Sequence, residues 1–116
     1  MQVPRPTEAD KERFRDLVPN DRNIEIKPMF GNLGAFVNGN MFMGLFGSDI
    51  GVKLSPADQD AVRAAGGGDF GPAERPMGGY VSLPGSAAPG QLSAWIAAAL
   101  GYVGSLPAKQ PKARKS

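Results

Sequence analysis

The chain has 116 residues, which is enough for one domain with a single modest hydrophobic core. It contains no cysteine and no histidine; this excludes disulfides and thiolate sites and argues against hydrolases, redox enzymes and zinc proteins. The net charge of +2 is uneven, because four basic residues lie in 109–115, whereas residues 1–108 hold nine basic and eleven acidic side chains.

The N-terminal part predicts a helix followed by a strand. Thr7 and, three residues later, Asp10 resemble a capping box, and an apolar stripe with helical spacing predicts a helix from 8 to 18. Residues 24–27 alternate between apolar and charged, which predicts a short strand over these four residues that Pro28 terminates.

The middle of the chain predicts two consecutive hairpins with strands at 33–37, 41–46 and 50–54. Asn38-Gly39 predicts a two-residue turn between the first two strands, because both residues tolerate a positive φ. A three-residue turn at 47–49 is expected to join the second and third strands.

The C-terminal part predicts two helices separated by a loop and a strand. Ser55-Pro56 marks the start of a helix over 56–65, and the glycines at 66–68 cap it. A loop anchored by Phe70 leads to a strand at 79–83, and a helix over 90–103 carries a long apolar stripe. The order of elements predicts an α+β fold in which N-terminal and C-terminal helices pack on an antiparallel sheet.

The predicted pairing assigns the strand residues to two faces of the sheet, because directly opposed residues share a face. The core face is expected to gather Leu33, Ala35, Val37, Phe42, Phe46, Ile50, Val52 and Leu54. The second face is thinner, although still apolar, and is expected to gather Gly34, Phe36, Met41, Met43, Leu45, Gly51 and Lys53.

Two interpretations of the second face stay open. Either the helix at 56–65 or the Phe70 loop covers it, or it is a surface for a protein partner or for a second copy of the chain. In the second case the partner-binding residues are Phe36, Met41, Met43, Leu45 and Lys53. Lys53 is interpreted either as a snorkelling edge lysine or as an anion contact.

An ordered series of residues resembles the N-terminal domain of the TfoX/Sxy competence-regulator family. The series comprises Met29-Phe30-Gly31, Gly34, Phe36, Asn38-Gly39, Met41-Phe42, Lys53, Ala65-Gly66, Phe70, Val81-Ser82-Leu83-Pro84, Leu92, Trp95 and Ala99. The resemblance implies a secretion-chaperone-like α+β fold and a role in regulating DNA-uptake genes, without a known active site. Complete regulators of this family carry a second, helical C-terminal domain, which is not expected here.

We therefore expect one domain over 1–107 and a disordered basic tail over 108–116. The leading functional prediction is a cytoplasmic, non-enzymatic regulatory or protein-interaction module without cofactor, metal or membrane attachment. The alternative is a transcriptional regulator that binds nucleic acid weakly through cations of the tail, without sequence preference. Those cations are Lys109, Lys112, Arg114 and Lys115.

Overall fold

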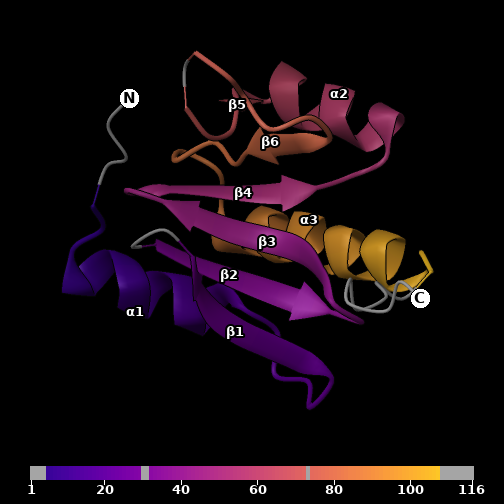
Figure 1. Cartoon of the computed structure of the whole chain (residues 1–116). Helices are drawn as coiled ribbons and strands as arrows, with labels where there is room; N and C mark the ends of the chain where they lie inside the picture. The colour runs from indigo at the N-terminus through magenta and orange to yellow at the C-terminus, as the bar shows by residue number, and fades with distance from the viewer. Residues whose placement is uncertain (1–4, 30–31, 73, 108–116) are drawn as a thin grey trace.

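The computed structural model describes residues 5–29, 32–72 and 74–107, which form a six-stranded antiparallel sheet and three helices (Figure 1). This confirms the predicted α+β fold. Along the sheet the strands lie in the order β1-β2-β3-β4-β6-β5. The elements are α1 (Glu8–Leu17), β1 (Ile24–Met29), β2 (Asn32–Val37), β3 (Asn40–Phe46), β4 (Asp49–Lys53), α2 (Pro56–Ala64), β5 (Gly68–Asp69), β6 (Tyr80–Ser82) and α3 (Pro89–Gly104).

Helices α1 and α2 begin where their capping residues predict. The Thr7 hydroxyl accepts from the Asp10 amide at 3.1 Å, and the Asp10 carboxylate accepts from the Thr7 amide at 2.9 Å, so the capping box is complete. The Ser55 hydroxyl accepts from the Asp58 amide at 3.4 Å and so caps α2, with Pro56 at the first helical position.

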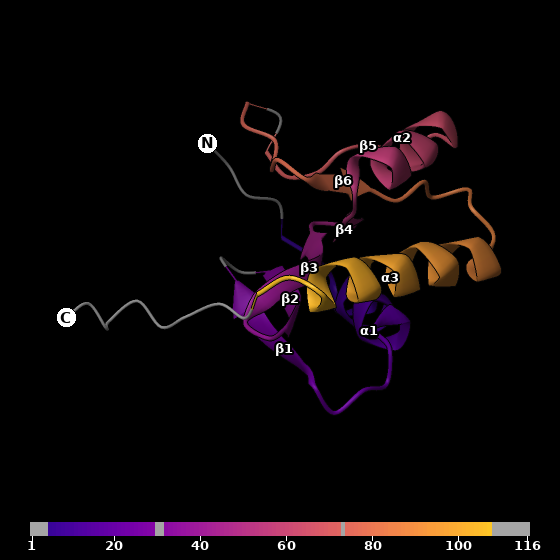
Figure 2. The same cartoon turned by 90° about the vertical axis from the view of Figure 1, so that its right-hand side faces the viewer.

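The core lies on one face of the sheet, beneath α1 and α3 (Figure 2). Phe14 of α1 and Ile96 of α3 are fully or almost fully buried there, and Val62 of α2 joins the same cluster. The helix at 56–65, one of the two predicted covers of the second face, therefore packs with the core instead.

The turn between β2 and β3 is the two-residue turn that Asn38-Gly39 predicts. Both residues have positive φ, 54° and 80°, as a type I′ turn requires. The Asn38 amide group donates to the Gly104 carbonyl at 3.4 Å, and that of Asn40 to the Pro107 carbonyl at 3.1 Å. These bonds hold the turn against the C-terminal end of α3.

The predicted register is right next to this turn and wrong beyond it. Phe36 pairs with Met41 as expected, but Ala35 pairs with Met43, because a β-bulge leaves Phe42 as an extra residue in β3. An extra residue moves every following side chain to the other face of the strand. Met43 and Leu45, predicted on the second face, are accordingly 0% and 3% exposed within the core cluster.

The second hairpin also differs from its prediction. Phe46 pairs with Asp49, so the turn has two residues, Gly47 and Ser48, rather than three. Gly47 has a φ of 65°, which fits the first central position of a type II′ turn, and its amide donates to the buried Asn32 side chain at 2.9 Å. Phe46, predicted in the core, packs instead against Phe70, with ring centroids 6.2 Å apart.

Strand β1 runs through Pro28 to Met29, two residues beyond its predicted end. Val37 flanks the two-residue turn and hydrogen-bonds across it, so its backbone groups point away from β1. Alternation along β2 then places Pro28, opposite Leu33, at a position whose N–H would point outward from the sheet. Proline is tolerated there because β1 is an edge strand.

Candidate interaction face

The second face of the sheet, opposite α1 and α3, carries a row of glycines. Gly34 of β2 pairs with Gly44 of β3, and Gly44 pairs with Gly51 of β4. Three adjacent strands therefore present no side chain at the same level, which allows another group to approach the backbone closely.

Phe70 fills this space over β3 and β4. A Cβ atom at Gly51 would lie 2.3 Å from the Phe70 ring, and one at Gly44 would lie 3.3 Å from it. Phe70 is only 3% exposed. Of the two covers predicted for the second face, the Phe70 loop is thus the correct one, and it covers the β3–β4 part.

Tyr80 of β6 borders the Phe70 ring, with centroids 6.2 Å apart. Its hydroxyl donates to the Met41 carbonyl at 2.7 Å, which links β6 to β3 across the face. Desolvation by burial raises the pKa of the Tyr80 phenol to about 12, so the group stays protonated near neutral pH. The Lys53 ammonium lies 5.6 Å from the centre of the Tyr80 ring, as expected for a lysine that lays its stem along an apolar surface.

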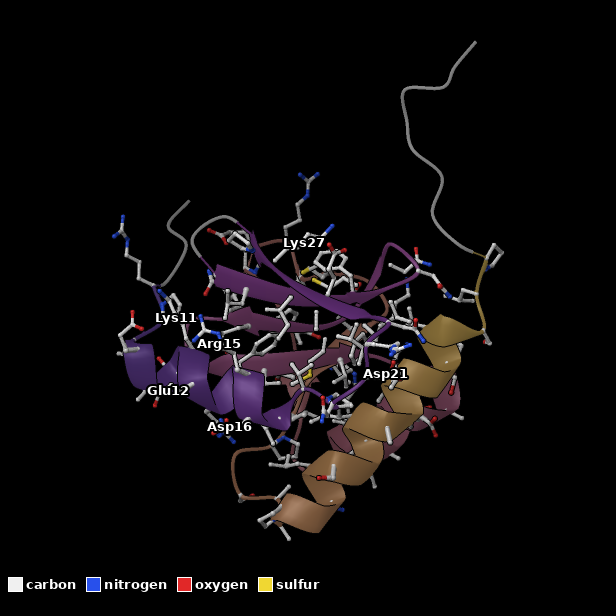
Figure 3. The ribbon with its side chains drawn as sticks, turned by 90° about the horizontal axis from the view of Figure 1, so that it is seen from below. Lys11, Glu12, Arg15, Asp16, Asp21 and Lys27 are labelled. Atoms are coloured by element: carbon white, nitrogen blue, oxygen red, sulfur yellow. The ribbon has the colours of Figure 1, made fainter. Side chains whose placement is uncertain are left out.

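The part of the face over β1, β2 and the start of β3 remains accessible, and we call four of its residues, Glu25, Lys27, Phe36 and Met41, the open patch. Phe36 and Met41 are half-buried, whereas Glu25 and Lys27 are exposed. The Lys27 ammonium lies 4.5 Å above the Phe36 ring and 3.9 Å from the Glu25 carboxylate. Figure 3 shows Lys27 on the side of the sheet opposite α1.

The structure thus brings together some of the predicted partner-binding residues and separates others. Phe36, Met41 and Lys53 lie on the second face, whereas Met43 and Leu45 are in the core. Sequence reasoning missed Glu25 and Lys27, although their alternation with Ile24 and Ile26 was visible. Lys109, Lys112, Arg114 and Lys115 lie outside the described residues.

Among the described residues, no three His, Cys, Asp or Glu side chains are grouped closely enough to hold a metal ion. None of the helices in the described part of the chain has the length and apolar character needed to cross a membrane. The open patch instead combines an aromatic ring, a thioether and two opposite charges, a mixture that suits binding to another protein.

Comparison with known proteins gives one family. The family model described as TfoX N-terminal domain matches residues 10–102, from α1 to the last turns of α3. No match is found among curated proteins or among solved structures.

Proposed function

Because the chain belongs to the TfoX N-terminal domain family, we propose that it is a non-enzymatic regulatory module that acts by binding another protein. The family is not a known enzyme family. Its link with competence supports a role in the control of DNA-uptake genes as part of the same proposal.

The observation that carries this proposal is the open patch. The core face is covered by helices and the β3–β4 part of the second face by Phe70, but Phe36 and Met41 keep accessible apolar surface beside Lys27. An accessible aromatic ring with a cation above it can contact an apolar side chain and a carboxylate of a partner together. The expected partner is therefore a protein segment with an apolar anchor next to an acidic residue.

Site-specific photo-crosslinking in extract of the source cell tests this proposal. A benzoylphenylalanine in place of Phe36 is expected to capture one protein, and adding Met41→Glu should abolish that capture. The same probe in place of Gln91, an exposed residue of α3 on the other side of the sheet, is the matched control. The captured protein is then purified, and its affinity for the wild type and for Met41→Glu is compared.

Position dependence decides the outcome. Capture at position 36 that is absent at position 91, followed by binding of the purified partner that Met41→Glu weakens at least ten-fold, supports the proposal. Equal capture at both positions, or binding that is indifferent to Met41→Glu, contradicts it.

The alternative function rests on the charge distribution. Residues 1–108 carry a net charge of −2, whereas Lys109, Lys112, Arg114 and Lys115 are unaccompanied by acidic residues. Such a cluster can bind nucleic-acid phosphates with strong salt dependence and little sequence preference. The two functions differ in the part of the chain they require, the open patch or the tail.

A further inference from the structure

Strand β1 forms one edge of the sheet, and the outward backbone groups of that edge follow from its pairing with β2. Ile24, Ile26 and Pro28 face outward, whereas Glu25 and Lys27 hydrogen-bond to β2. The Ile24 amide already donates to the Asp21 carbonyl at 3.0 Å, and Pro28 has no N–H. Ile26 therefore supplies both a donor and an acceptor at the centre of this edge.

Among the large hydrophobic residues that the structure describes, Ile26 alone is exposed to solvent, at 39%. It points to the core side of the sheet, since it lies opposite Ala35. A second strand laid along β1 would bury this side chain and use its backbone groups at the same time.

The charges of β1 select one self-pairing register. Glu25 and Lys27 flank Ile26 and are 74% and 49% exposed. In an antiparallel pair of two β1 strands centred on Ile26, each Glu25 lies opposite Lys27 of the other copy. Centring on Glu25 or on Lys27 would instead place like charges directly opposite each other, which is unfavourable.

We propose that two copies of this chain associate through their β1 edges, antiparallel and centred on Ile26. The two Ile26 residues exchange two backbone hydrogen bonds, their side chains lie opposite each other on one face, and two Glu25–Lys27 pairs form on the other. This inference goes beyond the proposed function and does not depend on it, because it concerns the edge of the sheet and needs no other protein.

The association is closed and weak. It is isologous, so each β1 edge is used once and no chain of subunits can grow. Pro28 and Lys27 suit this arrangement, because proline and lysine on an edge strand hinder longer pairing. An interface of one short strand falls below the roughly 1,200 Å² of standard interfaces, which predicts a transient dimer.

The dimer also extends the open patch. Glu25 and Lys27 belong both to that patch and to the self-pairing register, so the two open patches meet across the two-fold axis. A joined sheet of two copies thus presents the Phe36 rings of both chains on one continuous face.

Charge reversal tests this register with purified full-length protein. Glu25→Lys makes both members of each cross-strand pair lysine, and Lys27→Glu makes both members glutamate, so each variant alone repels its own copies. Each is expected to raise the dimer dissociation constant about ten- to thirty-fold.

In an equimolar mixture of the two variants, one chain of each heterodimer carries lysine at both positions and the other carries glutamate at both, so the centred register places only opposite charges across from each other. The mixture therefore restores both opposite-charge pairs and is expected to form heterodimers about as tightly as the wild type dimerises.

Sedimentation velocity of the wild type, each variant and the mixture, up to about 1 mM, measures these constants. The double variant Glu25→Lys/Lys27→Glu should also regain self-association, and far-ultraviolet circular dichroism confirms that each variant is folded. Arg15→Glu, on the exposed side of α1, is a matched charge reversal away from β1 and should change nothing. A wild type that stays monomeric, or a mixture that associates no better than its components, overturns the proposal.

Failure of this proposal and failure of the proposed function are distinguishable. Self-association is measured on the purified chain alone, whereas partner capture depends on Phe36 and Met41. Met41→Glu should leave the dimer dissociation constant unchanged, because Met41 lies on β3, two strands from the β1 edge.

Discussion

Replacing Gly51 with alanine tests the fit of Phe70 on the glycine row. The new Cβ would lie 2.3 Å from two atoms of the Phe70 ring and 2.7 Å from a third. These atoms are Cγ and the two Cδ atoms, which lie close to the Phe70 backbone, so a small movement of the far end of the ring cannot relieve the overlap. Either the backbone of β4 shifts, or the ring leaves its place.

The two responses bound the size of the effect. Accommodating an extra methyl group in a packed site costs about 1–3 kcal/mol. Expelling the ring sets the upper limit, because losing a buried phenylalanine costs about 3–5 kcal/mol. We expect Gly51→Ala to lower the free energy of unfolding by about 2 kcal/mol, which is a large share of the roughly 5–15 kcal/mol of a typical domain.

A double-mutant cycle separates this clash from an effect of the strand itself. Urea denaturation is measured for the wild type, Gly51→Ala, Phe70→Ala and the double variant. Once Phe70 is alanine the overlap is gone, so Gly51→Ala should then be neutral or stabilising by up to about 1 kcal/mol, because glycine weakens strands. Gly78→Ala is the matched control, because no atom lies within 4 Å of its Cβ position.

The coupling energy between positions 51 and 70 decides the outcome. A value of at least about 1 kcal/mol is expected for residues in direct contact. If Gly51→Ala costs the same with and without the Phe70 ring, or costs less than about 0.5 kcal/mol in the wild type, the role assigned to the glycine row is wrong.

Three further predictions concern a phenol, a helix and the tail. Tyr80 should ionise near pH 12, two units above its ordinary value of 10. Because the unfolded chain binds fewer protons between these two pH values, the stabilisation that comes from protonated Tyr80 is fully present below pH 10 and is lost as the pH rises towards 12. Ultraviolet titration should show a late phenolate transition that Tyr80→Phe removes, and its persistence in that variant would refute the assignment. Gly101→Ala should stabilise α3 by about 1 kcal/mol in urea denaturation, because the position is exposed and open; a destabilised variant would contradict this. Fluorescence anisotropy with duplex DNA at low and physiological salt should show weak binding that is lost from a chain ending at Ala108, and equal behaviour of the two chains would exclude the tail as the binding element.

Local signals in the sequence were enough to predict most elements. Thr7 and Ser55 each cap the helix predicted after them, and Asn38-Gly39 forms the turn predicted between two strands. Each of these signals acts within four residues, through a side-chain hydrogen bond or an allowed positive φ. Such signals need no knowledge of the rest of the fold, which is why they could be read correctly.

The errors share a different cause, because each depends on a neighbour that is distant in sequence. Proline usually ends a strand because it has no backbone N–H. Strand β1 nevertheless continues through Pro28, because at this position of the edge strand no N–H is needed to bond to β2. Phe42 and Met43 are consecutive strand residues, yet both are fully buried in the core. Two neighbours can point to the same face because the bulge makes Phe42 an extra residue in β3. Gly51 gives no sign that its missing side chain accommodates Phe70, nineteen residues further on.

The bulge at Phe42 determines the chemistry of both faces. A regular hairpin would send Met43 and Leu45 to the second face and leave Gly44 in the core. With the extra residue, the large side chains enter the core, and Gly44 aligns with Gly34 and Gly51 on the other side. The second face then has room for one aromatic ring, which Phe70 supplies over β3 and β4.

The same arrangement explains why the accessible binding groups lie on β1, β2 and the start of β3. Phe70 and Tyr80 occupy the β4 end of the face, so apolar surface remains accessible mainly around Phe36 and Met41. The glycine row itself ends at Lys27, because Gly34 of β2 pairs with Lys27 of the edge strand β1. A partner protein bound at the open patch and a second copy bound at the β1 edge would therefore share Glu25 and Lys27. Self-association and partner binding are expected to influence each other through these two charges.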